Sequence, residues 1–286
     1  MTRQRIGIVQ TTTGIDPVVE AGRLADAIGR LATDGAGVVF TPEMSGRLDR
    51  DRKRLMASLT RESDDPVLAA VRAAAARHGV WVHLGSLALD SGDGRVVNRG
   101  FLIDAGGGIV AHYDKIHLFD VDLPGGERYR ESSTYAPGER AVVAASPLGG
   151  LGLTICYDVR FPALHAALAR AGARVIAVPA AFTRPTGRAH WEVLLRARAI
   201  ETGCFVVAAA QTGEHDDGRA THGHSLVVSP WGEVLLDMGE PAGEAVVDID
   251  LALVDEARGR VPSLRHERDW AMPLPLAVPL EAGAAE

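Results

Sequence analysis

Cysteine, aromatic residues and long apolar runs are all scarce in this chain of 286 residues. Only two cysteines occur, Cys156 and Cys204, and neither belongs to a CxxC pair or to a Cys/His spacing typical of a metal site. No stretch approaches the roughly 18 apolar residues that a membrane-spanning helix needs. The first residues contain no apolar segment with a cleavage site, so no secretory signal is expected. These absences predict a cytoplasmic protein with no disulfide framework, metal or membrane partner.

A basic stripe is missing as well. The formal net charge is −7, and the longest basic run, residues 50–54 (RDRKR), is diluted by Asp49 and Asp51. A protein that binds a phosphate backbone needs clustered positive charge, so nucleic acid is not an expected partner. The chain does have apolar residues, which make up 47% of it, enough for a sizeable core. No repeat or linker divides it, which predicts a single domain over 1–286, with its core at about 4–255 and a tail at 256–286.

Strand-like and helix-like patterns alternate in the first part of the chain, which indicates the α/β class. Helices are predicted at 17–34, 67–78, 163–170 and 189–202, and strands at 6–12, 38–42, 80–89, 96–104, 109–115, 142–144, 151–155, 175–182, 205–211, 225–229, 234–237 and 245–249. Four helices are too few to cover both faces of one parallel sheet of about a dozen strands. Two sheets packed face to face, with helices outside, bury the strands better, so we expect a four-layer αββα sandwich. The irregular stretch 116–140 is expected to be a functional loop or a lid.

The cysteine at position 156 follows an apolar strand and precedes a turn and a helix. This order, in residues 151–162 (LGLTICYDVRFP), is typical of a nucleophile elbow. Such a turn places the thiol near helical N–H groups, which lower a thiol pKa and can bind an oxyanion. The alternative is that Cys156 is a small buried hydrophobic residue, the commoner fate of cysteine. Cys204 begins a run of valine and alanine, and we interpret it as part of the core.

Two charged residues also close apolar strands. Glu43 ends the stretch VVFTPE, where desolvation would raise its pKa toward the range of a general base. Lys115 ends the strand before IHLFD, where its ammonium could hold an oxyanion or pair with Glu43. The alternatives are a capping or salt-bridged acid for Glu43 and a solvated strand-end lysine for Lys115.

Taken together, these motifs resemble those of the nitrilase (carbon–nitrogen hydrolase) superfamily. The resemblance covers nearly the whole chain, in the family's order and spacing: residues 41–43 (TPE), 113–118 (YDKIHL), 155–162 (ICYDVRFP), 190–202 (HWE to IET) and 223–232 (GHS to PWG). It implies the αββα sandwich already expected from the strand count. It also implies a homodimer or a larger homo-oligomer, with the C-terminal tail at the subunit contact.

The resemblance further implies an amide hydrolase that needs no cofactor. Cys156 would be the nucleophile, Glu43 the general base, and Lys115 with the backbone N–H of Tyr157 the oxyanion site. A thioester acyl-enzyme would form and then be hydrolysed. Glu131 matches a second glutamate of many members and would support Lys115. The nearby Glu127 is an alternative for that position, and a solvated loop acid is the alternative role for Glu131.

Within the superfamily, residues 117–125 and 180–191 resemble the branch that acts on ω-amides of dicarboxylic acids. That branch includes deaminated-glutathione amidase, to which residues 189–202 and 208–211 are most similar, and ω-amidase. Its substrates carry a 2-oxo acid carboxylate, for which Arg160 is the natural partner, with Phe182 and Thr186 lining the pocket. An ion pair between Arg160 and Asp158 is the alternative. Nitrile or N-carbamoyl hydrolysis, acyl transfer and a catalytically silent scaffold remain the rival functions.

Overall fold

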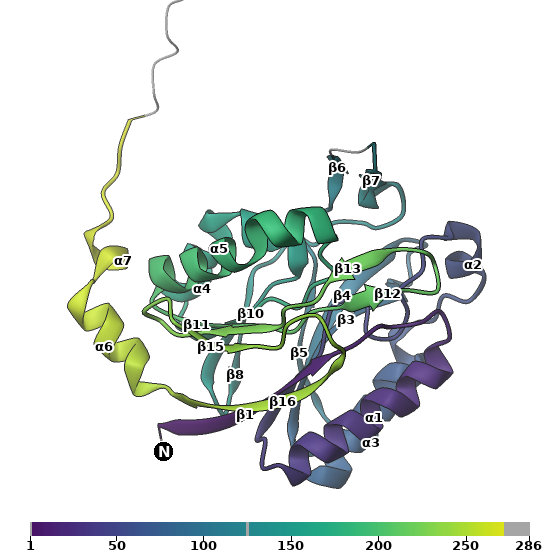
Figure 1. Cartoon of the computed structure of the whole chain (residues 1–286), viewed down its shortest axis with the longest axis horizontal. Helices are drawn as coiled ribbons and strands as arrows, with labels where there is room; N and C mark the ends of the chain where they lie inside the picture. Colours follow the sequence, from purple (N-terminus) through teal and green to yellow (C-terminus); the bar gives the residue numbers. More distant parts are fainter. Residues whose placement is uncertain (1, 124–125, 272–286) are drawn as a thin grey trace, which may run out of the picture.

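The computed structural model describes residues 2–123 and 126–271, and two six-stranded sheets dominate it (Figure 1). The first sheet has the order β16-β1-β2-β3-β4-β5, and the second has the order β15-β14-β11-β10-β9-β8. The first consists of β1 (Arg3–Gln10), β2 (Val38–Phe40), β3 (Trp81–Asp90), β4 (Val96–Ile103), β5 (Ile109–Asp114) and β16 (Gly243–Asp250). The second consists of β8 (Val142–Ser146), β9 (Gly149–Leu153), β10 (Ala173–Ala177), β11 (Phe205–Ala208), β14 (Leu226–Val228) and β15 (Val234–Asp237).

Helices cover the outer face of each sheet, which confirms the predicted four-layer sandwich. Helices α1 (Pro17–Thr33) and α3 (Pro66–His78) pack on the first sheet, and α4 (Pro162–Arg170) and α5 (Arg184–Thr202) lie over the second (Figure 1). The described residues contain three further α-helices: α2 (Arg52–Ala57), α6 (Ala252–Arg260) and α7 (Ser263–His266). In the described part of the chain, no helix is both long and apolar enough to cross a membrane.

The alternation of side chains along β2 shows how one strand serves two cores. Val38 and Phe40 point into the core between the sheets, whereas Val39 points into the core beneath α1 and α3. All three are buried, because successive side chains of a strand face opposite sides of its sheet. A strand buried on both faces therefore needs a continuous apolar run, as VVF is.

The central strands of both sheets run parallel, which matters for the site. Strands β1, β2 and β3 are parallel neighbours, as are β9, β10 and β11. Because the carboxyl ends of parallel strands meet at one edge, the residues just after β2 and β9 come together where the sheets face each other. Two small hairpins border this edge, β6 (Asp120–Asp122) with β7 (Arg128–Arg130), and β12 (Thr212–Glu214) with β13 (Ala220–His222).

Several predicted boundaries were wrong, two of them by more than three residues, and the helices α2, α6 and α7 were not predicted. The helix predicted from residue 189 begins at Arg184, because the Thr183 side chain caps it and Pro185 occupies its first turn. The strand predicted at 175–182 ends at Ala177, because the chain then leaves the sheet and keeps only an isolated bridge between Ala180 and Ala210.

Two other predicted segments are only partly tested. The stretch 116–140 contains the hairpin β6–β7 and a short 3-10 helix at Glu131–Ser133, so it is less irregular than expected. Its role as a lid stays a prediction. The tail at 256–286 begins within α6 and continues through α7, and both helices pack against the core of the sandwich, α6 through Val254 and α7 through Leu264. Residues 272–286 lie outside the described residues, and the placement of the tail at a subunit contact stays a prediction.

Candidate active site

Glu43 is held in place by the tight turn that follows β2. Before Glu43, the Thr41 hydroxyl accepts a hydrogen bond from the Gly85 N–H (3.0 Å). Directly after Glu43, Met44 adopts a left-handed backbone (φ 55°). Position 85 must be glycine, because a Cβ there would lie 2.2 Å from the Thr41 carbonyl oxygen. The Glu43 side chain is thus buried at 4% exposure, and its Oε2 accepts from the Ala181 N–H at 2.9 Å.

Lys115 lies just beyond β5 and connects two carboxylates. Its Nζ is 2.9 Å from Glu43 Oε1 and 2.9 Å from Glu131 Oε2. The Asn98 amide on β4 also donates to both carboxylates, to Glu43 at 2.9 Å and to Glu131 at 3.3 Å. Glu127 instead accepts from the Tyr129 hydroxyl at 3.2 Å, so Glu131 is the glutamate that the fold places against Lys115.

Cys156 begins the turn that follows β9. Its backbone is left-handed (φ 50°), its N–H donates to the Pro179 carbonyl (2.8 Å), and a 3-10 helix spans Cys156–Arg160 before α4 starts. Strand, sharp turn and helix are therefore present as the sequence predicted, although the helix nearest the thiol is a short 3-10 segment. A left-handed backbone at a residue other than glycine costs energy and recurs at functional sites.

The charges around Glu43 determine where the protons lie. Burial by itself would raise the pKa of Glu43, but the adjacent Lys115 ammonium and the hydrogen bonds with Cys156 and Asn98 together outweigh burial and lower that pKa below its usual value, so the rise expected from the sequence was wrong. Burial, reinforced by the Glu43 charge, raises the pKa of the Cys156 thiol well above its usual value. Burial opposes the charge on Lys115, but Glu131 and Glu43 raise the pKa of Lys115 well above normal. At neutral pH the site therefore holds a protonated thiol beside an ionised carboxylate and an ammonium.

A third carboxylate, that of Asp158, is fully buried and connects the Lys115 segment to the Cys156 turn. Asp158 is 0% exposed and accepts from the Tyr113 hydroxyl (2.7 Å), the Ile155 N–H (2.8 Å) and the His117 N–H (3.1 Å), and it is also 2.7 Å from His117 Nδ1. The residues on either side of Lys115 are thus tied to the turn that carries the thiol.

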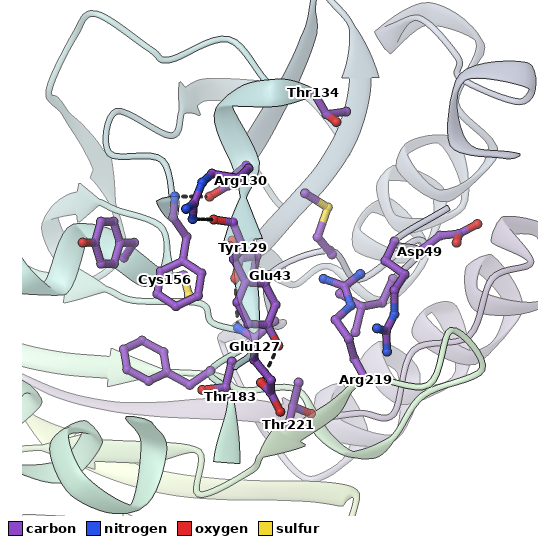
Figure 2. A pocket seen from close by; sticks show the side chains of 18 of the residues that line it. Glu43, Asp49, Glu127, Tyr129, Arg130, Thr134, Cys156, Thr183, Arg219 and Thr221 are labelled. Atoms are coloured by element: carbon purple, nitrogen blue, oxygen red, sulfur yellow. Dashed lines mark hydrogen bonds between the residues drawn. The ribbon is translucent and has the colours of Figure 1, made fainter. Parts of the chain in front are cut away.

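These groups open into a cavity of about 810 Å³. Phe182 and Thr186 line it, as predicted, and so do Cys156, Glu43 and Lys115. Figure 2 shows Cys156 and Glu43 on one side of this pocket and Arg219 on the opposite side.

Arg160 lies beside the pocket but is not one of its lining residues. Its guanidinium is centred 5.8 Å from the Tyr157 ring and 5.6 Å from the Phe182 ring, and its Nη2 is 3.2 Å from His190 Nδ1. Among the described residues it forms no ion pair with Asp158, whose oxygens have other partners. The alternative interpretation as a structural ion pair was therefore wrong.

The sequence interpretation missed Asn98 and Arg219 at the site. Asn98 is a buried polar residue in the otherwise apolar start of a strand (VVNRG), which is a signal that could have marked it. Arg219 lies in a polar loop before β13, where the sequence carries no such signal. Cys204 is 0% exposed in the core, as predicted, and both cysteines are free.

Comparison with known proteins agrees with this geometry. The carbon–nitrogen hydrolase family model matches residues 5–259. Deaminated glutathione amidase of Yersinia enterocolitica is 39% identical over 271 residues, which cover 94% of each chain. The crystal structure of the Caenorhabditis elegans NitFhit protein superposes with a TM-score of 0.86 at 37% identity, over 94% of this chain and 66% of that one. An amidase from Nesterenkonia sp. AN1, solved as a mutant with acrylamide added at the active-site cysteine, has a TM-score of 0.75 at 28% identity, over 91% of this chain and 98% of that one.

The chain therefore belongs to the carbon–nitrogen hydrolase family. It is an amidohydrolase that acts on carbon–nitrogen bonds other than peptide bonds.

Proposed function

We propose that the protein hydrolyses an ω-amide of a dicarboxylic acid, such as deaminated glutathione, through a thioester on Cys156. The main support is the arrangement of Lys115 between Glu43 and Glu131, next to a buried thiol at the pocket wall. The substrate class is supported by the relative from Yersinia, which is similar to this chain over nearly its full length.

The proton positions suggest the order of events. Glu43 takes the proton of the Cys156 thiol, and the thiolate attacks the amide carbon. The negative charge that develops on the amide oxygen is stabilised by the Lys115 ammonium and by the backbone N–H of Tyr157. Glu43 then returns its proton to the leaving amine, and a thioester remains. A water molecule, deprotonated by Glu43, attacks that thioester and releases the carboxylic acid and the thiol.

Glu131 has a supporting role in this scheme. A buried ammonium between two carboxylates stays charged, because both anions favour its protonated form. Glu43 can then accept the thiol proton while Glu131 continues to compensate Lys115.

Arg160 is proposed to bind the carboxylate of the acyl fragment. Its guanidinium lies over the ring of Phe182, which lines the pocket, and its only polar partner among the described side chains is His190. Both rings that Arg160 contacts, Tyr157 and Phe182, line the pocket, and Phe182 and Thr186 would lie beside the substrate chain.

The proposal is tested by supplying deaminated glutathione and measuring cysteinylglycine and 2-oxoglutarate. Cys156→Ala should lower kcat by at least about a thousandfold, and the control Cys204→Ala should leave it near the wild-type value. Acid-quenched wild-type enzyme should carry the acyl mass on the peptide that contains residue 156. A Cys156→Ala variant that keeps a tenth of the activity would exclude the thioester route. Faster ammonia release from 2-oxoglutaramate would instead indicate an ω-amidase.

A further inference from the structure

The pocket is rich in positive charge although the chain as a whole is acidic. The formal net charge is −7, yet seven arginines line the cavity against four carboxylates. Two of those carboxylates, Glu43 and Glu131, already bind Lys115. Arg128 and Arg130 share the carboxylate of Asp122, and Arg184 pairs with Glu214, so the positive excess lies with the remaining arginines. A cleft that gathers one sign of charge raises the local concentration of the opposite sign, so this cavity favours an anion.

Two of the arginines are fixed by one buried acid on the side of the pocket away from Cys156. Arg219 Nε is 2.7 Å from Asp217 Oδ2, and the Arg50 backbone N–H donates to the same oxygen at 2.9 Å. Arg50 Nε also donates to the Asp217 carbonyl at 2.8 Å, and the Asp217 side chain is 0% exposed. The single loop around Asp217 therefore holds both guanidinium groups.

Both guanidinium groups keep hydrogen-bonding capacity for a ligand. Each is anchored through Nε, and in residues 2–123 and 126–271 no hydrogen bond uses the Nη atoms of Arg50 or Arg219. Asp217 compensates one of the two positive charges, which leaves the pair with a net positive charge. Guanidinium Nη groups that are fixed in direction suit a carboxylate, which can accept from two of them at once.

The location of the pair fits the amine side of an amide substrate. Arg160, proposed for the acyl carboxylate, stacks near Tyr157 and Phe182, whereas Arg219 lies across the pocket beyond Tyr129 (Figure 2). A cavity of about 810 Å³ has the size of sites for drug-sized ligands and exceeds what a primary amide fills.

We propose that Arg219 and Arg50 bind a carboxylate carried by the amine fragment of the substrate, so that the enzyme selects amides whose leaving group is a peptide acid. This inference rests on the proposed hydrolysis of ω-amides. Glu127 also lines this pocket and accepts a hydrogen bond from Tyr129. Its negative charge repels a carboxylate and so opposes the attraction of Arg219 and Arg50.

The test compares deaminated glutathione with its C-terminal carboxamide, which differs only in the charge of the leaving group. Wild-type enzyme should prefer the acid in kcat/KM. Arg219→Gln should lower kcat/KM for the acid by about ten- to a hundredfold and change it for the carboxamide by less than about threefold. Arg50→Gln should show the same selective loss. Arg50 is exposed, so the Arg50→Gln variant should fold even if the Arg219→Gln variant does not, for lack of the ion pair with Asp217.

Three further variants sharpen the result. Arg219→Lys should keep part of the preference, and Glu127→Gln should increase it. Arg77→Gln removes one charge from the exposed end of α3, away from the pocket, and should change neither substrate. Equal losses for acid and carboxamide in the Arg50 and Arg219 variants, or a wild-type enzyme without preference, would overturn this inference while leaving the proposed function intact. If wild-type enzyme cleaves neither substrate, both proposals fail.

Discussion

Replacement of Asp158 by asparagine tests whether one buried carboxylate holds the two catalytic segments together. Oδ1 of Asp158 contacts the N–H and Nδ1 of His117, and Oδ2 accepts from the Tyr113 hydroxyl and the Ile155 N–H. An amide has the same shape but presents an NH₂ group in place of one oxygen. In either orientation that group faces a backbone N–H, from His117 or from Ile155, and two donors cannot bond.

The expected cost follows from these contacts. One bond to a charged acceptor is lost, worth about 1.5–3 kcal/mol, and one buried donor is left without a partner, at about 1–3 kcal/mol. Asp158→Asn should therefore lower the free energy of unfolding by about 3–5 kcal/mol, because the site has no exposure to water that could replace the bonds. The control Tyr113→Phe removes one donor to this carboxylate and leaves no donor facing another donor at Asp158, so it should cost less, about 1.5–3 kcal/mol.

The measurement combines urea denaturation with kcat on the folded fraction. Both Lys115 and Cys156 are positioned through Asp158, and a misplacement of about 1 Å costs up to about a hundredfold in rate, so kcat should fall about ten- to a hundredfold. An Asp158→Asn variant as stable as Tyr113→Phe and fully active would refute the positioning argument.

Three further predictions concern separate groups. Lys115→Ala should lower kcat by about a hundred- to a thousandfold with little change in KM, because the lost ammonium acts on charge that develops in the transition state; a change in KM alone would make Lys115 a substrate-binding residue. Arg160→Ala should reduce kcat/KM about ten- to a hundredfold for a 2-oxo acid amide and leave a neutral amide of similar size almost unchanged, whereas equal losses would contradict its role as carboxylate partner. Burial lowers the pKa of His83 to about 3. Below about pH 6.5 the unfolded chain therefore binds a proton at His83 that the native state excludes. The free energy of unfolding should fall by about 1.4 kcal/mol per pH unit as the pH decreases from about 6.5 toward 3. His83→Leu should flatten this part of the stability curve in urea denaturation series, and an unchanged slope would contradict the assignment.

The sequence alone determined the layers of the fold and the three residues at the strand ends. Apolar periodicity is a property of neighbouring residues, so the strands of the two sheets and the helices α1, α3, α4 and α5 could be located along the chain. Glu43, Lys115 and Cys156 could be recognised because each follows the end of an apolar strand. Their motifs also occur in the same order and at the same spacing as those of the nitrilase superfamily. Boundaries failed where a local cap such as Thr183 outweighed the apolar pattern.

Only the tertiary structure decided which distant residues meet. Glu131 rather than Glu127 contacts Lys115, because the chain after β7 folds back over the end of β5. Arg160 stacks on aromatic rings instead of pairing with Asp158, its near neighbour in sequence, because the 3-10 turn directs Asp158 inward to four other contacts. Arg219 reaches the pocket through a loop whose course depends on how the two sheets pack. Contacts between residues far apart in the chain depend on strand register and sheet packing, which no local pattern encodes.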